Sequence, residues 1–105
     1  MNTTPNNARD ALYIVLDQIP EGRFTTYGRL ADMMPVRTSV RQVARLLGRL
    51  PEGTQLPWHR VVNSQFKLAN FGGQEEQVQR LKSEGLLPSA TGRLPANKVW
   101  PDLNC

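Results

Sequence analysis

The chain has 105 residues, of which 39% are hydrophobic, and a formal net charge of +4, which predicts one small basic domain with a modest core. Its short apolar runs exclude a transmembrane helix and residues 1–10 do not resemble a signal peptide, so we expect a cytoplasmic protein without a membrane partner. Because Cys105 is the only cysteine, a disulfide framework and a cysteine-based metal site are excluded within one chain.

The first half of the chain predicts three helices with short breaks between them. The first, over residues 8–19, follows asparagines that can cap it and carries apolar side chains at helical spacing. The second, over residues 26–34, starts at a pair of threonines and ends before Pro35. The third runs from about residue 39 to 50, with Val40, Val43, Ala44 and Leu47 expected to point inward.

The second half predicts a small β-hairpin and one more helix. Short strands over residues 60–63 and 66–70 flank a turn, and residues 74–84 have the spacing of a helix. The order of elements predicts a mostly α fold, a winged helix-turn-helix with a three-helix bundle, a short β-hairpin wing and a fourth helix. This domain would span residues 1–87, and residues 88–105, rich in proline and small polar residues, would form an irregular C-terminal tail.

The positive charge gathers on the third predicted helix. Residues 37–49 contain four arginines and no acidic residue, so this stretch alone accounts for the net charge. Arg41, Arg45 and Arg49 are four residues apart and therefore share one face, opposite the apolar one. Like charges at this spacing repel one another, so the pattern favours an anionic partner, DNA, over a merely solvated face.

Residues 57–62, with the sequence PWHRVV, place the chain's single histidine between a tryptophan and an arginine. A histidine works as a general base only where it has a nucleophile to activate, and Trp58 offers an indole instead. One histidine and one distant cysteine cannot assemble an ordinary zinc site. The residues alone therefore favour a structural His59 over a catalytic one, and we expect no catalytic residue, metal or cofactor.

Five segments together resemble the DNA-binding domain of O6-alkylguanine-DNA alkyltransferases. They are IPEGRFTTYGRLADMM, SVRQVARLLGRL, PWHRVVNSQ, FGG and RLKSEGL, in the family's order and spacing over about residues 9–87. Those enzymes have Pro-Cys-His-Arg, with the cysteine as alkyl acceptor, where this chain has tryptophan at position 58. The chain is therefore similar to the alkyltransferase-like proteins, which implies a homologue of the enzymes that lacks the nucleophile and is not itself an enzyme.

The resemblance implies roles for individual residues. Tyr27 matches the tyrosine that crowds a backbone phosphate and rotates the nucleotide outward, although the residue pattern alone favours a core aromatic. Arg41 matches the arginine finger that fills the space left by the extruded base. Arg45 and Arg49 are expected to make general contacts with the DNA. The predicted wall of the base pocket consists of Trp58, His59, Val61, Val62 and Phe71.

Three further positions bear on the site through the same resemblance. Glu84 matches the glutamate that polarises the histidine in the enzymes, so the His59–Glu84 pair is expected to persist here as a structural pair. Leu50 stands where the enzymes usually have an asparagine after the recognition helix. Phe71 stands in place of their lid tyrosine, and it can stack on a base but cannot donate a hydrogen bond.

The resemblance implies a sensor of O6-alkylguanine in double-stranded DNA that binds the minor groove and flips the damaged base without repairing it. By the same analogy the complex would mark the lesion for nucleotide excision repair proteins. We expect a monomer, associated with the nucleoid when it is bound to DNA. Three alternatives stay open: a true alkyltransferase with another acceptor, a winged-helix transcription regulator without lesion preference, and a module that binds an acidic protein.

Overall fold

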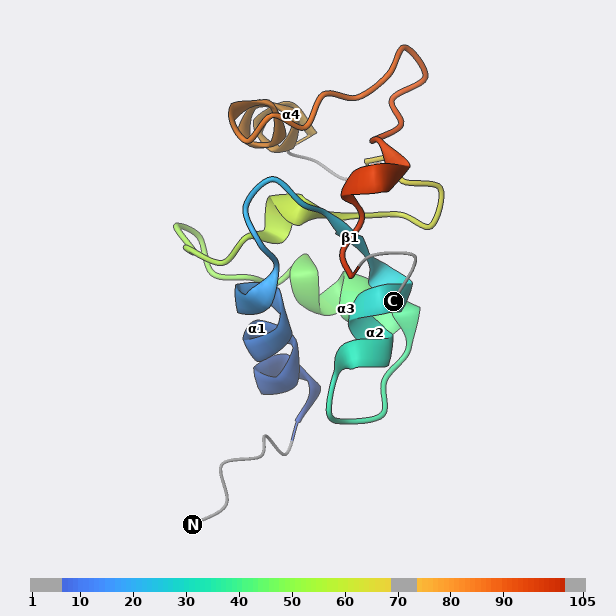
Figure 1. The fold of residues 1–105 in the computed structure, drawn as a ribbon. Helices are drawn as coiled ribbons and strands as arrows, with labels where there is room; N and C mark the ends of the chain where they lie inside the picture. Colours follow the sequence, from blue (N-terminus) through green and yellow to red (C-terminus); the bar gives the residue numbers. More distant parts are fainter. Residues whose placement is uncertain (1–6, 69–73, 102–105) are drawn as a thin grey trace.

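The computed structural model describes residues 7–68 and 74–101, and helices dominate it (Figure 1). Among these residues, no helix combines the length and the apolar character needed to cross a bilayer. In chain order the elements are α1 (Ala8–Gln18), β1 (Thr25–Thr26), α2 (Tyr27–Met33), α3 (Val40–Leu47), the 3₁₀ turn η1 (Trp58–Arg60), β2 (Val61–Val62), α4 (Gln74–Ser83) and the 3₁₀ turn η2 (Ala96–Lys98). The predicted mostly helical class is confirmed.

The first three helices begin where the sequence offers a capping side chain. Asn7, Thr26 and Ser39 each accept a hydrogen bond from the backbone N–H three residues further on, at 2.9, 3.2 and 3.1 Å. The helices are therefore close to their predicted bounds, except that α3 ends at Leu47 instead of continuing to residue 50. Arg49 consequently lies beyond the helix.

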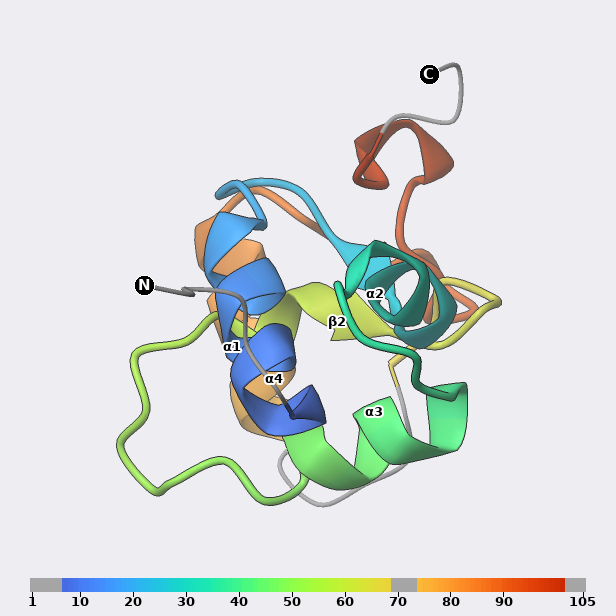
Figure 2. The same cartoon turned by 90° about the horizontal axis from the view of Figure 1, so that it is seen from below.

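α1, α2 and α3 pack against one another around a first apolar cluster, and Figure 1 shows α4 on the other side of the short strands. Figure 2 shows the same three helices from below. Val40 was predicted to point inward, but it is 51% exposed because its neighbour on α2 is Gly28, which has no side chain to cover it. The buried members of the cluster are Ala11, Leu12, Val15, Leu16, Ile19, Tyr27, Leu30, Met34, Val43 and Val61.

A second apolar cluster joins the C-terminal segment to the strands and α4. Leu94 and Val99 are buried in it, and they come from the segment predicted to be an irregular tail. The backbone of Phe24 ties this segment down, because its N–H donates to the carbonyl of Lys98 at 3.2 Å and its carbonyl accepts from the N–H of Trp100 at 2.7 Å. Residues 94–100 therefore contribute to the core although only η2 has regular structure among them.

The β structure differs from the predicted hairpin. β2 pairs in parallel with β1, residue for residue, instead of with residues 66–70. The chain does turn back at Asn63, whose N–H donates to the carbonyl of Lys67 at 2.9 Å, but Lys67 then forms an isolated bridge with Arg93. The end of the predicted second strand lies outside the described residues. Parallel pairing lets the two valines of β2 enter both apolar clusters, which a solvent-facing wing would not allow.

Candidate nucleic-acid interface

The exposed side of α3 carries a concentration of positive charge. Arg41 and Arg45 lie one helical turn apart and are exposed, and Arg49 is exposed just after the helix. Among the residues that the structure describes, none of these three guanidinium groups forms an ion pair with an acidic side chain. Their charge is therefore available to an external anion such as a phosphate.

A cavity of about 390 Å³ lies behind α3, where α2, η1 and α4 converge. This volume lies in the range of roughly 300–1,000 Å³ that is typical of small-molecule sites in proteins. The cavity can therefore accept a group the size of one nucleobase. Its lining residues are Tyr27, Ala44, Leu47, Gly48, Trp58, Val61 and Gln77.

The indole of Trp58 forms part of the wall without filling the cavity. It also lines a second hollow of about 330 Å³, so Trp58 borders both spaces. The guanidinium of Arg80 lies over the indole, 5.6 Å from the ring centroid, and is held by Glu76 through a 2.7 Å ion pair. The ring of His59 meets the indole edge-on at 6.2 Å. These contacts hold the apolar indole ring of Trp58 beside the cavity.

Tyr27 is the first residue of α2 and lies at the cavity with its side chain almost covered. It is only 9% exposed and belongs to the first apolar cluster. Burial raises the pKa of its phenol to about 12, so the hydroxyl stays protonated at neutral pH. The residue thus takes part in the core, as its pattern suggested, and in the cavity wall.

Close to the cavity, a buried carboxylate connects three segments of the chain. Oε2 of Glu84 lies 2.7 Å from Nε2 of His59 and accepts a hydrogen bond from Nη2 of Arg60, also at 2.7 Å. Oε1 accepts the backbone N–H of Gly22 at 3.0 Å and Nε of Arg60 at 3.0 Å. The structure therefore brings the two residues of the predicted pair together and adds Arg60, which sequence reasoning had not included.

The charge states of this cluster follow from its contacts. Burial would by itself raise the pKa of Glu84, but hydrogen bonds from Arg60, His59 and Gly22 outweigh it and lower the pKa to about 2. Burial lowers the pKa of His59 despite the opposing effect of Glu84. A neutral His59 donates Nε2–H to the carboxylate, and its Nδ1 is sealed without a partner among the described residues.

The other predicted pocket residues lie in different places. Val61 lines the cavity, whereas Val62 points to the opposite face of β2 and is buried in the second apolar cluster. His59 lies behind Trp58 and is not among the lining residues. Leu50 is partly buried against the first cluster and lines the second hollow, which Trp58 also borders. Phe71 lies outside the described residues.

Gln77 lines the cavity but was not predicted from the sequence. It is only 8% exposed, and its Nε2 donates to the carbonyls of His59 and Val61 at 3.1 and 3.0 Å. The spacing of α4 could have indicated it, because Gln77 lies four residues before the fully buried Leu81 and seven before Glu84. Gln77 and Leu81 therefore lie on the inward side of α4, and Glu84 follows directly after its end.

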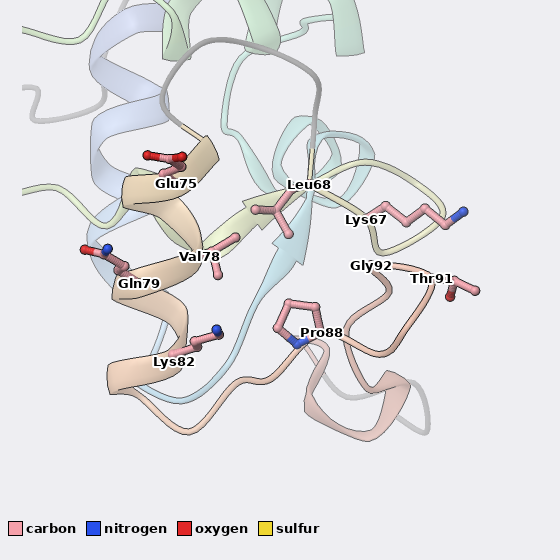
Figure 3. A pocket seen from close by; sticks show the side chains of 9 residues that line it. All are labelled: Lys67, Leu68, Glu75, Val78, Gln79, Lys82, Pro88, Thr91 and Gly92. Carbon is pink, nitrogen blue, oxygen red and sulfur yellow. The ribbon is translucent and has the colours of Figure 1, made fainter.

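A larger groove of about 720 Å³ lies on another side of α4 (Figure 3). None of the α3 arginines lines this groove, and α4 contributes Val78 and Lys82 to it instead of Gln77. The larger volume of the groove therefore does not make it the candidate DNA site. In the described parts of the chain, no group of three or more His, Cys, Asp or Glu side chains is placed to hold a metal ion. The groove is lined by Lys67, Leu68, Glu75, Val78, Gln79, Lys82, Pro88, Thr91 and Gly92.

Comparison with known proteins relates these features to a family. Residues 7–86 match the family model described as 6-O-methylguanine DNA methyltransferase, DNA binding domain. A DNA base-flipping protein of Vibrio parahaemolyticus is 41% identical over 88 residues, which make up 83% of this chain and 88% of that protein. Alkyltransferase-like protein 1 of Schizosaccharomyces pombe is 33% identical over 78 residues, 71% of this chain and 72% of that protein.

The fold is similar to that of a solved protein–DNA complex. The crystal structure of Schizosaccharomyces pombe Atl1 in complex with damaged DNA containing O6-carboxymethylguanine matches with a TM-score of 0.76 and 28% identity. The match covers 88% of this chain and 93% of that chain. The segment that matches the family model also contains every residue that lines the cavity. The chain therefore belongs to the family of the 6-O-methylguanine DNA methyltransferase DNA-binding domain.

Proposed function

We propose that this protein recognises O6-alkylguanine in double-stranded DNA by flipping the damaged base into the cavity beside Trp58. The observation that carries the proposal is the position of a base-sized cavity directly behind a helix whose exposed arginines have no acidic partner among the described residues. Relatives named as a DNA base-flipping protein and an alkyltransferase-like protein support it, as does Atl1 bound to damaged DNA. Binding would occur from the minor groove.

The energetics of base flipping explain why a damaged base is selected. Extruding a base costs a few kcal/mol of stacking and pairing, and less where a lesion has already weakened the pair. Alkylation at O6 of guanine removes the N1 proton and adds apolar bulk, so pairing weakens and burial becomes more favourable. Arg41 would fill the space left in the stack, while the indole of Trp58 contacts the base and its alkyl group.

Recognition without alkyl transfer follows from the chemistry of the cavity wall. The indole of Trp58 is a poor nucleophile, so the neighbouring His59, which donates to Glu84, has no thiol beside it. The pair therefore supports the η1 turn and has no group to activate. Since the lesion persists in the complex, other proteins must remove it, and we propose that the complex marks it for nucleotide excision repair proteins on DNA in the cytoplasm or nucleoid.

One paired measurement tests the proposal. The affinity of the protein is measured for a duplex with guanine or O6-methylguanine at a single position, alongside a transfer assay with a labelled methyl group. We expect tighter binding to the methylated duplex and no label on the protein. Label on the protein would indicate an alkyltransferase, and equal affinity combined with a base-sequence preference would indicate a transcription regulator. A lack of DNA binding at low salt would favour an acidic protein partner.

A further inference from the structure

We propose that Gln77 recognises the exocyclic 2-amino group of the flipped base and so makes the cavity selective for alkylated purines that carry this group. The inference rests on the proposed base-flipping function, because it assigns a specificity role within the same cavity. Gln77 lines that cavity together with Tyr27, Trp58 and Val61, and its side chain brings a carboxamide group to the wall. Its contacts determine which of its groups is available to a ligand.

The orientation of the Gln77 amide is fixed by two backbone acceptors. Nε2 donates one hydrogen to the carbonyl of His59 at 3.1 Å and the other to the carbonyl of Val61 at 3.0 Å. Turning the amide over would place its oxygen against both carbonyl oxygens, which is unfavourable because all three atoms are acceptors. The nitrogen is therefore fully used by the protein, and Oε1 is the group that remains for a ligand.

Oε1 of Gln77 is both unused and reachable. No residue in the described ranges donates a hydrogen bond to it. The polar side-chain atoms that are sealed from solvent without a partner are Thr25 Oγ1 and His59 Nδ1, so Oε1 retains some accessible surface. Since Gln77 is only 8% exposed and lines the cavity, that surface supplies an acceptor in a wall formed mostly by apolar groups.

The chemistry of O6-alkylguanine fits such an acceptor. Alkylation at O6 removes the N1 proton, so the 2-amino group is the hydrogen-bond donor left on the pairing edge of the base. Adenine and thymine lack this group, which is also what distinguishes guanine in the minor groove. A site built around a hydrogen bond discriminates strongly against an analogue that lacks the matching group, because the buried partner is then left unsatisfied.

A cycle that combines protein variants with base analogues tests the assignment. Affinities are measured for duplexes that differ at one position, which holds O6-methylguanine or 6-methoxypurine, the same base without the 2-amino group. For the wild-type protein we expect about tenfold tighter binding to O6-methylguanine, the range of one buried hydrogen bond. In Gln77→Met, which keeps the length of the side chain and removes the acceptor, the ratio of the two affinities should approach one.

A second variant separates recognition from support of the fold. Gln77→Lys keeps a donor for the carbonyls of His59 and Val61 but has no acceptor, so it should also abolish the preference for the 2-amino group. Gln79→Met, on the exposed groove side of α4, is the matched control and should retain the wild-type ratio. Because the lysine retains the backbone contacts, it also carries the test if Gln77→Met does not fold.

The outcomes distinguish this inference from the proposed function. If both Gln77 variants lower the affinity for the two lesions equally and leave the ratio unchanged, Gln77 only supports the backbone and the inference is wrong. If the wild-type protein prefers O6-methylguanine to guanine but does not distinguish it from 6-methoxypurine, the inference fails while the proposed function stands. If it does not distinguish O6-methylguanine from guanine at all, the proposed function itself fails.

Discussion

Arg60 and the arginines of α3 carry the same charged group in opposite environments. The side chain of Arg60 is 15% exposed and donates to both oxygens of Glu84 and to the carbonyl of Ile19 at 2.8 Å. Arg41 and Arg45 are exposed, and no acidic side chain in the described part of the chain pairs with them. An arginine whose donors are satisfied internally holds the fold together, whereas one without internal partners can bind a ligand.

The largest effect should come from breaking the internal arrangement. Glu84→Gln keeps the shape of the side chain but removes the charge that compensates Arg60, so we expect a loss of about 3–5 kcal/mol in the free energy of unfolding. Urea denaturation at neutral pH measures it. Glu76→Gln, on the helix that ends just before Glu84, is the matched control, because it breaks only the exposed pair with Arg80 and should cost about 0.3–0.5 kcal/mol.

The second effect is a loss of stability in acid that depends on the same carboxylate. The folded pKa of Glu84 is about 2, below its ordinary value of 4.5, so the unfolded chain binds the proton more tightly. The stabilisation is complete above pH 4.5 and is lost as the pH falls toward 2, by roughly 2–3 kcal/mol. The lowered pKa of His59 acts in the same direction below pH 6.5.

Denaturation midpoints between pH 7 and pH 3 measure this dependence. Glu84→Gln should flatten the curve below pH 4.5 because it has no carboxylate to titrate. A variant that follows the wild-type curve through that range would show that other groups control the acid transition.

These internal contacts also show what the sequence could and could not predict. The helices with their caps were predictable because helical spacing and capping residues are local properties. The pairing of β2 with β1 was not, since it depends on two apolar clusters formed by distant segments, one of which includes Leu94 and Val99. Because proline and small polar residues surround those two side chains in the sequence, this part of the core was predicted to be an irregular tail.

The site was predictable where the resemblance supplied the positions. His59 and Glu84, 25 residues apart, could not be paired by spacing alone, yet they meet at 2.7 Å. Val62 was placed with Val61 because the two are adjacent, but neighbouring residues of a strand point to opposite faces. Gln77 escaped notice because a glutamine on a helix is usually exposed, and only the carbonyls of η1 and β2 explain its burial.

The third effect concerns the arginines without internal partners. Arg41→Ala should reduce the preference for O6-methylguanine over guanine by about 1–2 kcal/mol, because nothing would then fill the space of the extruded base. Arg45→Ala is the matched variant one turn away, and it should weaken binding to both duplexes alike. Arg45→Ala should also lower the salt dependence of binding by about one counterion, as expected for an arginine that contacts a phosphate. Loss of discrimination in Arg45→Ala alone would reverse the two roles.

The smallest effect should come from Arg80, which lies between the two environments. Its guanidinium is partly exposed, yet it is held by Glu76 and lies over the indole of Trp58. Arg80→Gln should therefore cost only about 0.5–1 kcal/mol of stability, the value of an exposed cation–π contact. If the arginine also restrains the indole at the cavity, the affinity for O6-methylguanine should fall further than in Glu76→Gln, which removes the ion pair but retains the arginine side chain. Equal affinities in the two variants would show that the indole keeps its position through packing alone.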